Sequence, residues 1–205
     1  MSQNLSTENS LQLSSQDLEK DSKIQFGFWV YIMTDCVLFA SLFATYAVLH
    51  TSTFGGTSGQ QLFNMHNVLA ETLLLLTSSF TCGLGILAAR AKDKQKVILW
   101  LLATFLLGLA FLALELTEFR HLYVDGNGWT RSAFLSAFYT LVGTHGLHIT
   151  IGLIWICTMA ARVYNAGLTK TNARQLTLLS IFWHFLDIVW IFIFTIVYLM
   201  GALGK

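Results

Sequence analysis

The sequence contains no proline and few charged residues. Only 11% of its 205 residues are Asp, Glu, Lys or Arg, whereas 55% are hydrophobic and the mean hydropathy is +0.61. A soluble domain of this length needs a more polar surface, so the composition excludes a soluble globule and indicates a membrane protein. Because proline is the commonest cause of helix kinks, its absence predicts straight, continuous membrane helices.

Cysteines and basic stretches are also scarce. Each of the three cysteines lies in a long apolar run without a second Cys or a His at metal-ligand spacing. We interpret Cys36, Cys82 and Cys157 as buried thiols, without a disulfide framework or a zinc site. The net charge of +1 includes no basic stripe, so nucleic acid is not an expected partner. The chain also lacks the motifs of serine hydrolases, zinc proteases and phosphate-binding loops.

Five apolar stretches are long enough to cross a bilayer, which takes about 20 residues each. They cover residues 24–50, 68–90, 97–118, 133–162 and 176–201. The short polar connections leave no room for a soluble domain. We therefore predict an all-α integral membrane bundle of five transmembrane helices within residues 24–205. Residues 1–23 are polar and lack the features of a secretory signal, so we expect a mobile N-terminal tail.

The lysines and arginines predict the orientation, because positive charge is retained on the cytoplasmic side during insertion. A cytoplasmic N-terminus and a periplasmic C-terminus place nine basic residues inside: Lys20, Lys23, Arg90, Lys92, Lys94, Lys96, Arg162, Lys170 and Arg174. Only Arg120, Arg131 and Lys205 then lie outside. This bias favours an N-in, C-out topology.

Eight acidic residues and histidines fall inside the predicted spans. They are Asp35, Glu71, Glu115, Glu118, His145, His148, His184 and Asp187. An ionisable group in hydrocarbon costs a few kcal/mol, so we expect each of them to face a partner inside the bundle. Asp35, the span-four histidines and Asp187 fall near mid-membrane, and the three glutamates fall toward the outer side. Pairs at i, i+3, such as His184 and Asp187, share one helix face.

Four interpretations of this polar set remain open. A metal site would use Glu118-x-x-His121, which has the spacing of a carboxylate-bridged di-metal centre, with Glu71 and Glu115 as candidate additional ligands. Such a centre needs the motif twice, but it occurs once, with His121 expected in a loop. Haem ligation would need histidines facing each other across the bundle. A proton path would need polar groups in series, yet the inner third of each span is apolar. The sequence favours the fourth, a buried cluster for helix packing or subunit contact.

Several long motifs carry a resemblance to a known family. They are GFWVYIMTDCVLFASLFATYAVL at 27–49, ETLLLLTSSFTCG at 71–83, ELTEF at 115–119, LVGTHGLHITIGLIW at 141–155 and WHFLDIVWIFIFTIVYLMG at 183–201. In this order they resemble subunit III of the haem-copper terminal oxidases. Five spans after a short tail are typical of the quinol oxidases, and the first motif is most similar to the cytochrome bo-type ubiquinol oxidases.

The resemblance implies a non-catalytic accessory subunit in the inner membrane of a bacterium. The whole complex would oxidise ubiquinol, reduce dioxygen to water and pump protons. Its haems and copper would lie in subunit I, and this chain would hold no catalytic, cofactor-binding or metal site. Subunit I, the other subunits and membrane phospholipids are the implied partners. Asp35 stands where related subunits have glutamate. The alternatives are a free-standing membrane enzyme with a carboxylate/His di-metal site, or a small proton carrier.

Overall fold

The computed structural model describes residues 2–52 and 65–203, which form helices and turns without any strand. The helices are α1 (Ser2–Leu49), α3 (Met65–Arg90), α4 (Lys94–Val124), α5 (Ala133–Ala166), α6 (Lys170–Ile193), the π-helical η1 (Phe194–Leu199) and α7 (Met200–Leu203). Five segments are long and apolar enough to cross a membrane: Glu19–Leu49, Met65–Arg90, Lys94–Val124, Ala133–Ala166 and Lys170–Leu199. The predicted all-α set of five membrane-spanning helices is therefore confirmed.

The chain divides into two units, residues 1–38 and 39–205. The first contains most of α1, which is helical from Ser2, where the composition predicts a mobile tail. An ion pair between Lys23 and Glu19, 2.8 Å apart and one helical turn from each other, supports the helix at the start of the membrane span. The boundary predicted between residues 23 and 24 stays a prediction. Most of the predicted loop at 51–61 lies outside the described residues.

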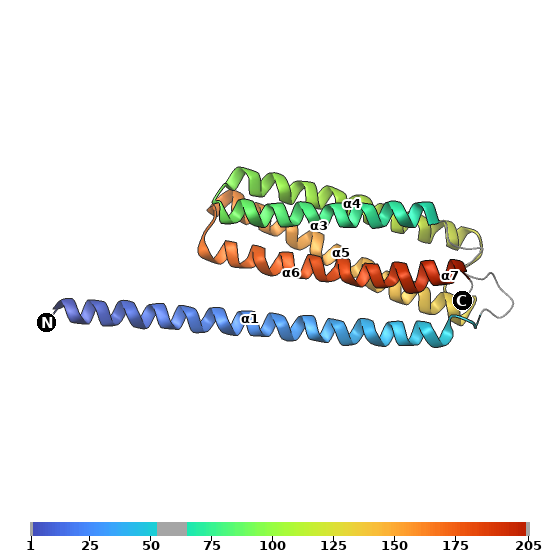
Figure 1. Cartoon of the computed structure of the whole chain (residues 1–205), viewed down its shortest axis with the longest axis horizontal. Helices are drawn as coiled ribbons and strands as arrows, with labels where there is room; N and C mark the ends of the chain where they lie inside the picture. Colours follow the sequence, from blue (N-terminus) through green and yellow to red (C-terminus); the bar gives the residue numbers. More distant parts are fainter. Residues whose placement is uncertain (1, 53–64, 204–205) are drawn as a thin grey trace. The chain divides into compact units, whose positions relative to one another are not determined.

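The second unit contains four long helices arranged as a ring (Figure 1). Around this ring α3 packs on α4, α4 on α5, α5 on α6, and α6 back on α3. Consecutive helices are joined by short connections and run antiparallel, as in other helical bundles. Because the ring closes between α3 and α6, residues about 100 positions apart in sequence meet at that contact.

Side-chain caps determine where three helices begin. Asp93, Ser132 and Thr169 each accept a hydrogen bond from a backbone N–H three residues later, at 3.2 Å in each case. This arrangement satisfies one of the four free N–H groups at a helix start. At the end of α5, Gly167 adopts a positive φ of 71° and its N–H bonds to the carbonyl of Val163. The turns therefore form without proline.

The last membrane span departs from the straight α-helix that the lack of proline predicts. At Phe194 the α-helical pattern of α6 gives way to the π-helical η1, which runs to Leu199. A π-helical turn uses i→i+5 hydrogen bonds and changes the direction in which the following side chains point. Val197 and Tyr198 of this segment are fully buried. The expectation of uninterrupted α-helices is thus wrong for the last span.

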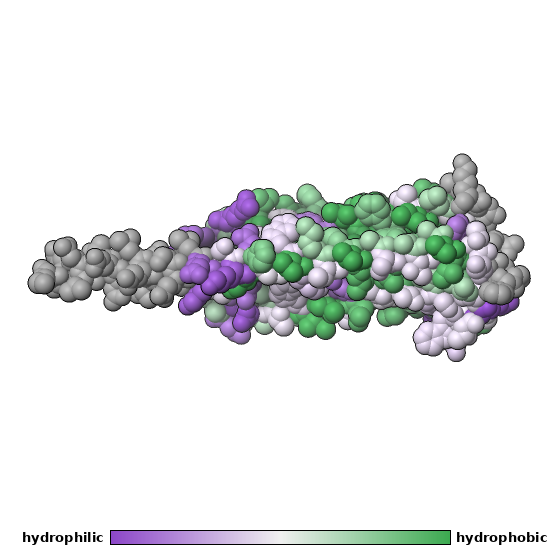
Figure 2. All heavy atoms as spheres, turned by 90° about the horizontal axis from the view of Figure 1, so that it is seen from below, coloured by the Kyte–Doolittle hydropathy of each residue, from purple (hydrophilic) through white to green (hydrophobic). Residues whose placement is uncertain are grey.

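Large apolar side chains on the outside of the bundle are exposed, as membrane helices require. Leu99, Leu106 and Ile154 are each more than half exposed. Figure 2 shows hydrophobic residues along the helices and hydrophilic residues gathered toward their ends. The cysteine prediction is correct in part, because Cys82 is buried whereas Cys36 and Cys157 are exposed.

Candidate functional site

Three aromatic rings of α6 form hydrogen bonds with three hydroxyls of α3. The indole N–H of Trp183 donates to Ser78 Oγ at 3.1 Å, and that of Trp190 donates to Thr72 Oγ1 at 3.1 Å. Between them, the Nδ1 of His184 bonds to Ser79 Oγ. The tryptophans are seven residues apart, which places them on one face of α6 two turns from each other. A row of ring-to-hydroxyl bonds therefore closes the ring of helices.

Ser79 lies between two of the predicted site residues. It bonds to His184 and lies beside the Asp187 carboxyl, one turn further along α6. Asp187 is only 7% exposed, so its carboxyl group is held inside the bundle. The structure thus brings His184 and Asp187 together on the same α3 serine. Both side chains lie on the face of α6 that is directed at α3.

The hydroxyl network extends from α3 to α4. Ser78 Oγ donates to the carbonyl of Thr104 at 3.3 Å, and the hydroxyls of Thr81 and Thr104 are 2.9 Å apart. Thr104 also bonds to the carbonyl of Trp100 on its own helix. Because membrane interiors offer no water to unpaired polar groups, these bonds stabilise the close approach of the helices. A single network therefore joins α6, α3 and α4.

Trp183 lies between two glycines on neighbouring helices. A Cβ added to Gly108 of α4 would be 2.9 Å from Cη2 of the indole, and one added to Gly152 of α5 would be 2.8 Å from Cζ3. Both distances are too short for a real side chain, so only glycine fits at these positions. The large ring contacts α4 and α5 while its N–H bonds to α3. Trp183 is thus the residue at which all four helices of the ring meet.

A second polar group gathers three carboxyls and a phenol. Glu71 and Glu115 are each 1% exposed, and Glu118 interacts electrostatically with both. Tyr198, from the π-helical segment, donates from its hydroxyl to Glu118 Oε2 at 3.1 Å. A Cβ added to Gly146 of α5 would be 2.7 Å from Glu115 Oε1, so glycine leaves room for the carboxyl. The three glutamates thus interact with one another, and one of them bonds to Tyr198.

Aromatic rings surround His145. Its imidazole stacks on Trp190 with ring centroids 5.4 Å apart, and Phe111 contacts its edge at 6.0 Å. The side chain is fully buried, and neither ring nitrogen has a hydrogen bond within the described part of the chain. His148, one turn later, donates from Nδ1 to the carbonyl of Thr144 at 2.7 Å. These two histidines therefore contact rings and backbone, while His184 contacts a hydroxyl.

The two residues of the di-metal motif lie one turn apart on α4 but differ in burial and in partners. Glu118 is half-buried and bonds to Tyr198, whereas His121 is exposed. His121 lies in α4, which continues to Val124, so its expected place in a loop is wrong. Among residues 2–52 and 65–203, no three His, Cys, Asp or Glu side chains form a group that holds a metal ion. The spacing of the motif is thus a consequence of helix periodicity, with its two members in different surroundings.

Asp35 lies in the first unit, near the middle of the membrane span of α1.

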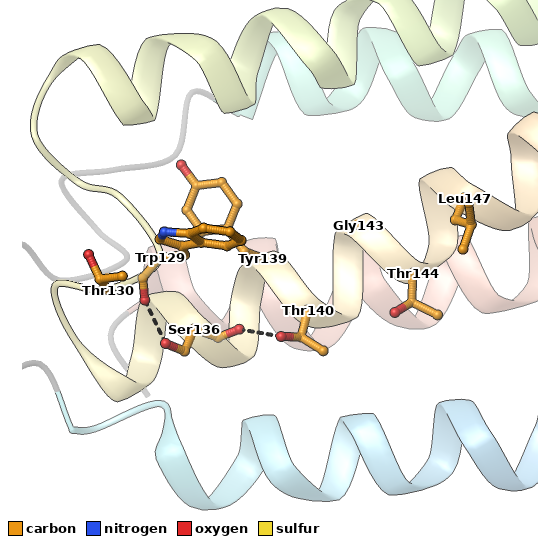
Figure 3. Close-up of a pocket in the computed structure, with 8 residues that line it drawn as sticks. All are labelled: Trp129, Thr130, Ser136, Tyr139, Thr140, Gly143, Thr144 and Leu147. Atoms are coloured by element: carbon orange, nitrogen blue, oxygen red, sulfur yellow. Dashed lines mark hydrogen bonds between the residues drawn. The ribbon is translucent and has the colours of Figure 1, made fainter.

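An open groove follows α5 near its N-terminal end (Figure 3). It has a volume of about 430 Å³ and is lined by Trp129, Thr130, Ser136, Tyr139, Thr140, Gly143, Thr144 and Leu147. Ser136 donates to the carbonyl of Trp129, and Thr140 donates to the carbonyl of Ser136. These hydroxyls thus bond within their own segment. The rest of the lining combines small side chains with the rings of Trp129 and Tyr139.

The hydroxyl partners are the functional residues that the predicted site set lacks. Ser78, Ser79 and Thr72 supply most of the bonds to α6, and Tyr198 anchors the acidic group. In the sequence, these partners could be found only from spacing: Trp183 and Trp190 are seven residues apart on one span, and Thr72 and Ser78 are six residues apart on another. This spacing becomes informative only when the two helices are known to be neighbours.

Comparisons with known proteins give relatives over most of the chain. Residues 3–202 match the sequence model of the cytochrome c oxidase subunit III family. The chain is 57% identical over 178 residues to the cytochrome bo(3) ubiquinol oxidase subunit 3 of Pseudomonas aeruginosa, an alignment that covers 87% of this chain and 85% of that protein. It is 54% identical over 177 residues to the protein of the same name from Pseudomonas putida, covering 86% of each. It is 50% identical over 178 residues to the cytochrome c oxidase subunit 3 of Bacillus sp. strain PS3, covering 87% of this chain and 86% of that one.

Proposed function

Because this chain belongs to the cytochrome c oxidase subunit III family, we propose that it is the non-catalytic accessory subunit III of a proton-pumping cytochrome bo-type ubiquinol oxidase. Relatives in this family carry the names of both ubiquinol and cytochrome c oxidases. The two Pseudomonas relatives, at 57% and 54% identity, support ubiquinol as the electron donor of the complex. Subunit I of that complex would carry the haems and the copper.

The main observation in support of this proposal is that buried polar residues bond to one another between helices. Trp183, Trp190 and His184 direct their ring nitrogens to hydroxyls of a neighbouring helix. Such bonds hold helices together, and each contributes on average about 0.6 kcal/mol in membrane proteins. A redox subunit would instead direct its histidines toward a cofactor. The core therefore supports a role in assembly and stability of the complex.

The eight predicted site residues form, in this proposal, a set of buried packing and subunit-contact groups. Asp187 and His184 act through Ser79, and the outer glutamates act through Tyr198 and one another. Asp35, near the middle of the membrane span of α1, is assigned the same role, because an ionisable group at that depth needs polar contacts. None of the eight is proposed to touch substrate.

The proposed topology is N-in and C-out across the bacterial inner membrane. It is supported by the α3–α4 and α5–α6 connections, which lie at the same end of the bundle and carry most of the basic residues. Positive charge near span ends is retained in the cytoplasm. Phospholipids and the other subunits would cover the exposed apolar faces of the helices.

Affinity purification through a tag on this chain tests the proposal. The expected result is a stable complex with a larger haem-containing subunit, active as a ubiquinol oxidase. Deletion of the chain should leave haem in the remaining complex while activity decays faster during turnover. Purification of the chain alone, with a bound metal and with activity of its own, would contradict the proposal.

A further inference from the structure

Two connections at one end of the bundle form a single basic surface. The α3–α4 turn and the end of α5 are joined by Lys94, whose Nζ donates to the carbonyl of Tyr164 at 2.8 Å and lies 5.3 Å from the centre of its ring. Segments 90–96 and 162–174 together carry seven Lys or Arg and one acidic residue, Asp93. The surface therefore has a strong net positive charge.

The acidic residue is already neutralised by a neighbour. Asp93 lies 3.0 Å from the Nζ of Lys96, and its carboxylate also caps α4. These hydrogen bonds hold the pKa of Asp93 below its usual value, so the carboxylate stays ionised and paired with Lys96. Because Asp93 is paired with Lys96, it does not compensate the positive charge of the other six Lys and Arg residues in the two segments. Among the described residues, no ion pair holds Arg90, Lys92 or Lys170.

The backbone at Lys92 provides an independent observation. Its φ of 58° is the only positive value at a non-glycine residue in the described chain. Here α3 ends in a Schellman motif, with the N–H of Asp93 bonded to the carbonyl of Ala88 and that of Lys92 to the carbonyl of Ala89. Glycine is preferred at this position because a Cβ raises its energy. The lysine at this position places a cation at the end of α3, where glycine would carry none.

Exposed apolar side chains lie along the helices that end at this surface. Leu87 on α3 is 59% exposed and Leu99 on α4 is 61% exposed, and Tyr164 lies at the end of α5 with its ring open. The spans of 26 to 34 residues are longer than the roughly 20 residues needed for the hydrocarbon core, so their ends reach the headgroup layer. Cations and apolar side chains are thus placed at the depths of a lipid headgroup and its acyl chains.

We propose that the surface formed by Arg90, Lys92, Arg162 and Lys170 binds the headgroup of one anionic phospholipid, whose acyl chains lie against Leu87 and Leu99. Basic pockets between membrane helices on the cytoplasmic side are suited to such headgroups. Tyr164 and Lys94 hold the two segments together, so that one phosphate meets cations from both. This inference rests on the proposed function only for the membrane orientation and for the complex in which it is tested.

The test uses the purified oxidase complex, delipidated in detergent and titrated with phosphatidylglycerol or with phosphatidylcholine. Bound lipid per complex is measured by native mass spectrometry. Wild type should bind phosphatidylglycerol in preference to phosphatidylcholine. Each Lys or Arg near an anionic group contributes about a fivefold change in affinity, so the pair Lys92→Gln and Lys170→Gln should bind about 25-fold more weakly. The exposed Arg120→Gln, at the opposite end of α4, should change the affinity less than about twofold by the same reasoning.

Lys92→Gly separates lipid binding from folding. It removes the charge and puts the preferred residue at the left-handed position, so the melting temperature of the complex should not fall while phosphatidylglycerol binding weakens about fivefold. Lys92→Arg should keep the binding. Unchanged phosphatidylglycerol affinity in the double variant, an equal loss in Arg120→Gln, or full competition by inorganic phosphate at the same concentration would overturn the proposal. If the lipid affinity falls while subunit retention, haem content and ubiquinol oxidation stay normal, the proposed function is unaffected.

Discussion

The indole of Trp183 contacts the backbone of Gly152 so closely that a Cβ on the glycine would lie 2.8 Å from Cζ3 of the ring. A Cβ on Gly108 would lie at a comparable distance, 2.9 Å, from Cη2 of the same ring. The indole N–H of Trp183 is bonded to Ser78 Oγ. The contact between α5 and α6 therefore depends on the missing side chain of Gly152 and on the large ring of Trp183.

Gly152→Ala is accordingly expected to destabilise the subunit. Overpacking of a filled core costs about 1–3 kcal/mol, and here the hydrogen bond to Ser78 resists displacement of the ring. The melting temperature of the purified complex and the amount of this subunit per haem should both fall. Gly83→Ala is the matched control, since a Cβ there meets nothing within 4 Å within this chain. Equal effects of the two substitutions would refute this account of Trp183.

Thr72→Val tests the bond at the other end of the α3–α6 row. Valine keeps the shape of threonine but removes the oxygen that accepts from Trp190, leaving a buried N–H without a partner. We expect a loss of stability of about 1 kcal/mol, within the range measured for polar contacts between membrane helices. Thr72→Ser keeps the hydroxyl and should lose less. Thermal unfolding of the two variant complexes compares them directly, and a more stable Val variant would show that the bond contributes nothing.

Asp187→Leu distinguishes a packing role from a catalytic one. Removal of the carboxyl beside Ser79 should cost about 1–3 kcal/mol, the range for a buried polar partner left unsatisfied. The subunit should dissociate more readily from the detergent-solubilised oxidase, while haem content and initial ubiquinol oxidation stay near wild type. Asp187→Asn should be milder, because an amide still forms hydrogen bonds. Lost initial turnover in complexes that retain the subunit and all their haem would assign Asp187 a direct part in chemistry.

Single cysteines test the topology. After replacement of Cys36, Cys82 and Cys157, a cysteine at position 125 should react with a membrane-impermeant maleimide in intact cells. Position 125 follows the end of α4, at the end of the bundle opposite Lys92. A cysteine at position 92 should react only after the inner membrane is permeabilised, because positive loops stay in the cytoplasm. The reverse labelling pattern would invert the proposed orientation.

The sequence predicts the spans better than it predicts the contacts between them. Long apolar runs give the five helices, because burial in hydrocarbon depends on composition summed over about 20 residues. Their ends extend further than predicted: α4 reaches Val124 and α5 reaches Ala166, where polar residues continue the helix into the headgroup layer. Hydropathy does not predict these polar helical turns, because they lie outside the apolar runs.

Partner choice is harder to predict because it depends on helix rotation. The meeting of His184 with Asp187 follows from their i, i+3 spacing on one helix, whereas Ser79 as their common partner requires the packing of α3 on α6. Polar contacts that differ by only a few tenths of a kcal/mol are not enough by themselves to determine how each helix is rotated about its axis. The π-helical turn that brings Tyr198 to Glu118 has no residue signature such as proline, so it also escapes prediction.

The row of bonds between α3 and α6 also constrains the order of biogenesis. A chain synthesised from its N-terminus places α3 in the membrane well before α6 has left the ribosome, because the paired residues are separated by 105 to 118 positions. During that interval the hydroxyl of Thr72 retains its bond to the carbonyl of Val68 on its own helix, and Ser78 lacks its indole donor. The helical ring therefore closes only when the last span is inserted. A chain truncated before Trp183 would leave the space beside Gly108 and Gly152 without the indole ring that fills it.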